Sequence, residues 1–228
     1  MSGAGRPRLA ELGLADPPER WEALSFAVRD ASVRLGGVVL RLGAAGEGIV
    51  SWALSGIAPG ITDLDGLPTS VIEPPLAEPG SSEHPNGGVA LDHVVVLTPD
   101  FERTSGALER AGMPLRRTNL VDVGAARVGA AGCPAGGKPA AGGFRQGFRR
   151  LGPAILELVE ARDAPPGPAR FWGLVVIVED LDALTTRLGD HLVGQIKPAV
   201  QPGRRIATLR ASAGLNSALA FMTPEPPG

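Results

Sequence analysis

The chain has 228 residues, 43% of them hydrophobic, and carries a formal net charge of −2 at pH 7. That length is sufficient for one large domain or two small ones with a buried core, and the composition is that of a globular protein. With a pI near 6.0 there is no basic field to hold a phosphate backbone, which excludes nucleic acid as an expected partner.

Targeting signals and membrane segments are not expected either. The N-terminal stretch Met1–Arg8 has no apolar core of a signal peptide, and no apolar run approaches the roughly 18 residues of a membrane helix. The single cysteine, Cys133, lies in a Gly/Ala-rich stretch with no base nearby, which favours an inert thiol over a nucleophile. We therefore expect a cytoplasmic protein without a membrane partner.

The first 88 residues are expected to have little regular structure apart from a few strands. Residues 1–19 are rich in Gly, Pro and Arg and predict a disordered tail. Residues 20–57 contain three apolar stretches and predict a small β-meander, with Gly36-Gly37 as a two-residue hairpin turn. Residues 58–88, rich in Pro, Gly, Ser and Glu, have the composition of a linker.

A clear strand–helix pattern begins near residue 90. The run Leu91–Leu97 is rich in β-branched residues and predicts a buried strand. A helix over about 99–111 should follow, with Thr98 as its cap and Pro99 at its first position. Gly112 then ends the helix.

This pattern occurs a second time, 80 residues further on. Trp172–Val178 predicts another strand and 180–189 another helix, so that His93 aligns with Gly173 and Asp100 with Asp180. A second match at an offset of 63 aligns Ala154–Val159 with Ser217–Met222. The first copy is longer because it contains a low-complexity loop at about Gly124–Gly143. An internal repeat of this kind indicates two related structural units.

The repeated segments resemble the vicinal oxygen chelate superfamily, which includes glyoxalase I, bleomycin-resistance proteins and extradiol dioxygenases. The resemblance rests on Leu91–Val96 with Asp100, on Gly152–Glu160, and on the degenerate second copy from Phe171 to Thr223. It implies an α+β fold in which two βαβββ modules, 90–160 and 171–224, form a curled mixed sheet around a cavity, with the helices outside. The N-terminal strands would precede this glyoxalase-like domain of residues 90–224.

The resemblance also implies a metal site, because metal ligands in this superfamily come from the first and last strands of each module. Module one supplies both, His93 and Glu157, whereas module two has Gly173 and Ala220 at the equivalent positions. One divalent ion (Zn, Fe, Mn or Mg) is the expected cofactor, with Gln146 as a candidate third ligand and no organic cofactor. Zn²⁺ usually takes at least three protein ligands, so the donor set is short.

The residues themselves support a polar site. Glu157 lies within an apolar strand, where a carboxylate is costly unless it is paired or metal-bound. Strand alternation places His93 and Glu157 on faces that can meet, so both are candidate catalytic residues. The alternative is a buried His–Glu hydrogen bond that only satisfies the two groups.

Two further segments are candidates for binding a small molecule. In 144–150, Gln146 and Phe148 alternate with arginines, as in a pocket wall, although an edge strand with solvated arginines has the same pattern. In 197–206, a Pro/Gly turn carries Gln201, Arg204 and Arg205, which could clamp an oxyanion at the cavity rim; an exposed turn is the alternative.

Among the other aromatic and titratable residues, Trp172 is expected in the core, and His84 and His191 at the surface.

Three hypotheses about function follow. One is a metal-assisted lyase, isomerase or dioxygenase acting on a substrate with vicinal oxygens. Another is a metal-free protein that binds or sequesters a small molecule, as bleomycin-resistance proteins do. A third is a structural or regulatory domain that has lost its site. The resemblance also implies a homodimer.

Overall fold

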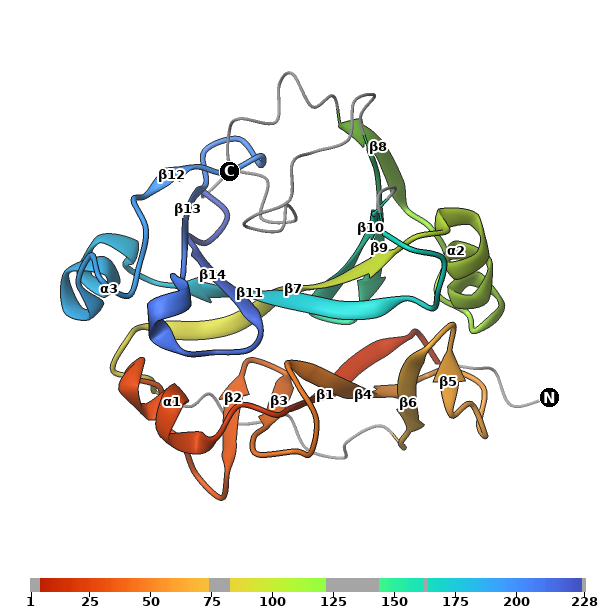
Figure 1. The fold of residues 1–228 in the computed structure, drawn as a ribbon, viewed down its shortest axis with the longest axis horizontal. Helices are drawn as coiled ribbons and strands as arrows, with labels where there is room; N and C mark the ends of the chain where they lie inside the picture. Colours follow the sequence, from red (N-terminus) through yellow and green to blue (C-terminus); the bar gives the residue numbers. More distant parts are fainter. Residues whose placement is uncertain (1–4, 74–82, 122–143, 162–163, 227–228) are drawn as a thin grey trace.

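The computed structural model describes residues 5–73, 83–121, 144–161 and 164–226. Two β-sheets are stacked on each other, a six-stranded N-terminal sheet and an eight-stranded C-terminal sheet (Figure 1). The loop Gly124–Gly143, with Cys133, falls outside the described residues. In the described part of the chain, no helix has the length and apolar character needed to cross a membrane.

The N-terminal sheet has the strand order β2-β3-β1-β4-β6-β5. Its elements are β1 (Arg8–Leu14), α1 (Pro18–Ala23), β2 (Ser32–Leu35), β3 (Val38–Arg41), β4 (Ile49–Ser55), β5 (Asp63–Leu64) and β6 (Leu67–Val71). Gly36 and Gly37 form the predicted two-residue turn, since Leu35 pairs with Val38 and Gly36 has a φ of 59°.

Three expectations for this region are wrong. The predicted disordered tail contains β1, because its leucines at positions 9, 12 and 14 are fully buried and outweigh the flanking Gly and Pro. The predicted linker 58–88 contains β5 and β6. The region is also no simple meander, since β1 lies between β3 and β4, parallel to the former and antiparallel to the latter.

The C-terminal sheet has the strand order β12-β13-β14-β11-β7-β10-β9-β8. Its elements are β7 (Gly88–Thr98), α2 (Phe101–Arg110), β8 (Arg117–Val121), β9 (Phe144–Leu151), β10 (Ala154–Glu160), β11 (Arg170–Val178), α3 (Leu181–Leu188), β12 (Lys197–Pro198), β13 (Arg205–Thr208), the 3-10 turn η1 (Ala211–Ala213) and β14 (Ala218–Met222). The sheet curls, and α2 and α3 lie outside it at opposite ends (Figure 1).

Strand register reproduces the sequence repeat. In module one β10 runs parallel to β7 and Ile155 pairs with His93; in module two β14 runs parallel to β11 and Ala218 pairs with Gly173. These pairs are related by the offsets of 80 and 63 residues. The antiparallel pair β7–β11 joins the modules at the centre of the sheet. The expected two-module α+β fold is thus confirmed.

The N-terminal sheet has the same strand pattern in reduced form. Its order β2-β3-β1-β4-β6-β5 corresponds to β9-β10-β7-β11-β14-β13, and every neighbouring pair has the same relative direction. The first half keeps its helix, α1, whereas β4, β5 and β6 follow one another with no helix between them. The chain therefore contains two similar sheets of different size.

The main hydrophobic core lies between the two sheets. Val94 and Val96 of β7, both fully buried, belong to the same apolar cluster as the leucines of β1. Aromatic pairs join the sheets as well: Trp52 packs edge-on against Phe171, with ring centroids 5.3 Å apart. This packing occupies the convex side of the C-terminal sheet and leaves its concave side free for a cavity.

Two local expectations need correction. Asp100 rather than Thr98 caps α2, since its side chain accepts a hydrogen bond from the Arg103 amide. His84 is buried: its Nδ1 accepts from the Ala27 amide and its Nε2 lies 2.8 Å from the Arg34 carbonyl. The ring connects the segment after α1 with strand β2, which could not be predicted from its Pro-rich neighbourhood. His191 is exposed as expected.

Candidate functional site

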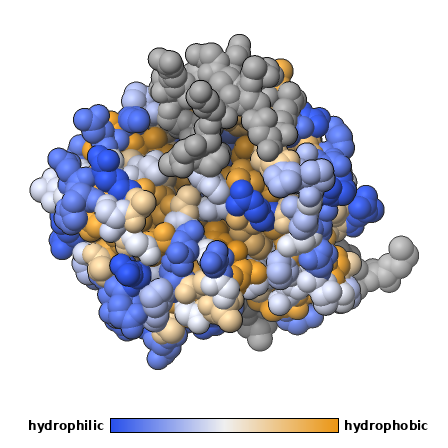
Figure 2. All heavy atoms as spheres, viewed as in Figure 1, coloured by the Kyte–Doolittle hydropathy of each residue, from blue (hydrophilic) through white to orange (hydrophobic). Residues whose placement is uncertain are grey.

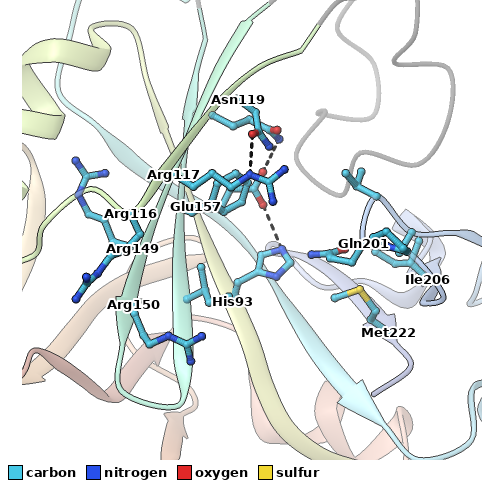
Figure 3. A pocket seen from close by; sticks show the side chains of 16 residues that line it. His93, Arg116, Arg117, Asn119, Arg149, Arg150, Glu157, Gln201, Ile206 and Met222 are labelled. Atoms are coloured by element: carbon cyan, nitrogen blue, oxygen red, sulfur yellow. Dashed lines mark hydrogen bonds and ion pairs between the residues drawn. The ribbon is translucent and has the colours of Figure 1, made fainter. Parts of the chain in front are cut away.

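The concave side of the C-terminal sheet holds a cavity of about 380 Å³. This volume is within the range of small-molecule sites. Its lining comes from both modules: His93, Gln146, Phe148 and Glu157 from module one, and Gln201, Ile206 and Met222 from module two. Figure 3 shows His93, Glu157 and Gln201 directed toward the same space. The sequence-predicted pair His93 and Glu157 therefore meets in one site.

A β-bulge places two consecutive side chains of β7 in the site. Val175 pairs with His93 and Val176 with Leu91, so Asp92 is an extra residue on β7. Because a bulge breaks strand alternation, Asp92 can bond to its own neighbour: His93 Nδ1 lies 2.6 Å from Asp92 Oδ2. An equivalent bulge occurs in module two at Trp172. It turns Trp172 away from the expected main core, to pack against Val95, Leu97 and Val159.

Glu157 lies between the imidazole and an amide. Its Oε2 is 3.2 Å from His93 Nε2, an ion-pair contact without hydrogen-bond alignment. Its Oε1 accepts a hydrogen bond of 2.6 Å from Gln146 Nε2. All three side chains are less than 8% exposed. The carboxylate is thus held from two sides and faces the cavity.

Arg204 does not clamp a ligand at the rim, in contrast to the expectation from sequence. It is 5% exposed, its Nη2 lies 2.9 Å from Asp92 Oδ1, and its Nε donates to the Thr223 carbonyl. The turn before β13 directs this side chain inward, toward the bulge of module one. Arg204 therefore supports the site from module two.

The four buried charged groups form a continuous chain: Arg204, Asp92, His93 and Glu157. Burial lowers the pKa of His93, but the hydrogen bond to Asp92 and the contact with Glu157 outweigh it and raise the pKa to about 9. Burial raises the pKa of Asp92, but His93 and Arg204 outweigh it, so the pKa lies below its usual range. At neutral pH two cations thus balance two carboxylates.

The donor set does not fit a resident metal ion. Among the described residues no three His, Cys, Asp or Glu side chains gather at one point. Gln146, the candidate third ligand, uses its amide nitrogen to hold Glu157. His93 has a carboxylate beside each ring nitrogen: Asp92 on Nδ1 is a partner that a metal-bound histidine would also have, but Glu157 lies on the side of Nε2 from which an ion would be held.

Module two cannot supply the missing histidine without a change in the backbone. A Cβ at Gly173 would lie 2.5 Å from the Ala218 carbonyl oxygen and 2.8 Å from the Ala218 Cβ. Parallel pairing of β11 with β14 produces this close approach. Glycine is therefore a packing requirement at this position.

The arginines near the cavity fall into two groups. On β9, Gly147 and Arg149 face α2, and Arg149 donates to the Ser105 side chain there, while Arg145 stacks on Phe101. Neither arginine is the solvated edge residue of the alternative interpretation. Arg205 lies outside the site as well, paired with Asp182 of α3.

Arg117 and Arg150 form the other group and point to the side of the sheet on which His93 lies (Figure 3).

Sequence reasoning missed Asp92, Arg117, Asn119 and Arg150. Asp92 enters the site only through the bulge, which the sequence pattern does not show. Arg150 alternates with Gln146 and Phe148 along β9. It could have been predicted on the cavity face if the predicted strand had extended to Leu151.

Comparisons with known proteins agree with this fold. No protein-family model and no curated protein matches the chain. Among solved structures, a triple mutant of 4-hydroxymandelate synthase from Streptomyces coelicolor superposes with a TM-score of 0.60 and 14% identity, covering 97% of this chain and 94% of that one. Methylmalonyl-CoA epimerase from Mycobacterium tuberculosis gives a TM-score of 0.46 and 17% identity, over 64% of this chain and 94% of the epimerase.

The protein has the vicinal oxygen chelate fold, as expected from the repeat and from the strand order of the C-terminal sheet.

Proposed function

We propose that this protein binds a small molecule with adjacent oxygen atoms in the cavity, and that it does so without a metal ion. The observation that carries the proposal is the charge-balanced chain that ends at the cavity. His93 Nε2 is a buried nitrogen without an aligned acceptor, and Glu157 beside it is an acceptor. A ligand hydroxyl or carbonyl can accept a hydrogen bond from the imidazolium, and a neighbouring hydroxyl can donate to Glu157.

Binding, rather than metal-assisted lyase, isomerase or dioxygenase chemistry, is the function that this donor set supports. Among the described residues, a metal ion at this point would have only His93 and Glu157 as ligands, fewer than the three protein ligands of catalytic Zn²⁺ sites. The row of four buried charged side chains, by contrast, has no net charge. It can therefore remain buried while it presents one donor and one acceptor to a ligand. We expect the protein to carry out this function as a homodimer in the cytoplasm.

Catechol, a neutral molecule with two vicinal oxygens, is a suitable probe. Isothermal titration of EDTA-treated protein should show saturable binding, weakened about tenfold in Glu157→Gln because a charged acceptor becomes neutral. Glu109→Gln, an exposed change on α2, is the matched control and should bind as wild type. Binding that requires an added divalent ion, or equal binding by Glu157→Gln, would contradict the proposal.

A further inference from the structure

Two arginines on one wall of the cavity extend the site beyond the His93–Glu157 pair. Arg117 of β8 pairs with Phe148, which in turn pairs with Glu157. Arg150 of β9 pairs with Ile155, which pairs with His93. Directly paired residues share a face of the sheet, so each arginine lies in the same cross-strand row as one member of the pair.

Neither of these guanidinium groups has a carboxylate partner among the described residues. Within the described ranges, Arg117 donates to the Asn119 side chain, 2.9 Å away, and neither Arg117 nor Arg150 has an ion pair. Both residues are exposed to the cavity solvent. Among the described residues that line the cavity, Glu157 is the one acidic residue, and His93 already balances it. This wall, as far as the structure describes it, therefore has a net positive charge.

The opposite part of the cavity is apolar. Val175, Ile206, Ala220 and Met222 form a small buried cluster on the module-two side, separate from the main core. Ile206 and Met222 line the cavity, and Ala199 packs against the cluster. In Figure 3 this side faces His93 from across the cavity, with Gln201 beside it. A purely polar ligand would leave this surface unused.

From these two walls we infer that the ligand is an organic anion with an apolar body. Its carboxylate, sulfonate or phosphate group would lie at Arg117 and Arg150, and its apolar part against Ile206 and Met222. This inference rests on the proposed function, since it adds an anionic group to a ligand whose adjacent oxygens meet His93 and Glu157. Guanidinium groups suit such anions because they offer a planar pair of donors.

A matched pair of fluorescent probes separates charge from apolar contact. 8-Anilinonaphthalene-1-sulfonate and N-phenyl-1-naphthylamine share one aromatic framework, and only the first carries an anionic group. In Arg117→Gln/Arg150→Gln the dissociation constant of the sulfonate should rise about tenfold or more, because charge-assisted hydrogen bonds are lost. The uncharged probe should bind within about twofold of wild type, since its contacts are retained.

The control is Arg110→Gln/Arg187→Gln, which removes the same charge from exposed positions on α2 and α3 and should leave both probes unchanged. Equal loss of both probes in the cavity variant, or no loss of the sulfonate, would overturn the inference. Catechol carries no anionic group, so its saturable binding to the wild-type protein tests the proposed function separately from the anionic ligand class. Failure of the ligand class is thereby distinguished from failure of the proposed function.

Discussion

Asp92 and Arg204 carry opposite charges in a part of the protein that is nearly closed to water, with exposures of 8% and 5%. An ion pair in such a place costs desolvation free energy on both sides, and removal of one partner leaves the other charge uncompensated. The next residue along the chain, Arg205, forms an ion pair of similar length with Asp182, 2.6 Å against 2.9 Å for Arg204 and Asp92, but this pair lies at the surface. The two neighbouring arginines thus allow the stability contributions of a buried and an exposed Arg–Asp ion pair to be compared directly.

Arg204→Met should lower the free energy of unfolding by about 3–5 kcal/mol, because Asp92 would remain buried without its cation. Arg205→Met should change the stability little, since water screens its exposed pair. Urea denaturation of the two variants measures the difference. Similar losses in both variants would show that the buried chain has no special role.

His93 should make the stability pH-dependent in a defined direction. Its pKa rises from 6.5 to about 9 on folding, so the stabilisation by its charged form is complete below pH 6.5 and is lost as pH rises through 9. Glu157→Gln removes one of the two carboxylates that raise this pKa, so the loss should begin at lower pH. Urea denaturation at pH 6.5–9.5 tests this, with Glu109→Gln as control; identical profiles for wild type and Glu157→Gln would contradict it.

At the scale of elements, the equivalent strands of the two modules differ in what their backbones permit. His93 of β7 and Gly173 of β11 follow equivalent bulges, but only the former has space for a side chain. At Gly173 the approach of β14 therefore leaves no room for a histidine side chain.

Gly173→Ala should destabilise the protein by about 1–3 kcal/mol, because its Cβ would overlap the Ala218 backbone. Gly167→Ala is the matched control: its Cβ would have only the Pro165 carbonyl oxygen nearby, at 3.9 Å. Thermal denaturation followed by circular dichroism distinguishes the two variants. A wild-type melting temperature for Gly173→Ala would show that β14 can move aside.

Elements with a strong periodic pattern could be predicted from the sequence, and short ones could not. The 80-residue repeat located β7, α2, β11 and α3, because in each copy a β-branched run is followed by an amphipathic helix. β1 was missed because its burial depends on partners about 30 and 40 residues away in β3 and β4. Likewise the meeting of His93 and Glu157 could be predicted from strand alternation. The contact between Asp92 and Arg204 could not, although Arg204 was expected near the cavity, because a bulge and a turn direct these two side chains.

At the scale of the whole molecule, the two sheets depend on one core. Phe26, in the segment after α1, stacks near Phe221 of β14, and Trp52 of β4 packs on Phe171 of β11. The convex face of β7 and β11 would be exposed to water if the N-terminal sheet separated from it.

We therefore expect the protein to unfold in a single cooperative transition. Far-UV circular dichroism reports on both sheets, and the fluorescence of Trp21 and Trp52 reports on the N-terminal part in a Trp172→Phe variant. The two urea transitions should coincide, because burial of shared apolar surface couples the sheets. Separate midpoints would show that the sheets are independent domains.

We infer that His93 is an imidazolium between two carboxylates and not a metal ligand. Nitrogen-15 NMR of the histidine rings at pH 7 tests it most directly. We predict a proton on both ring nitrogens of His93 and a spectrum that one equivalent of Zn²⁺ or Mn²⁺ leaves unchanged. A His93 Nε2 without a proton, with a signal that one equivalent of either metal shifts or broadens, would contradict the account.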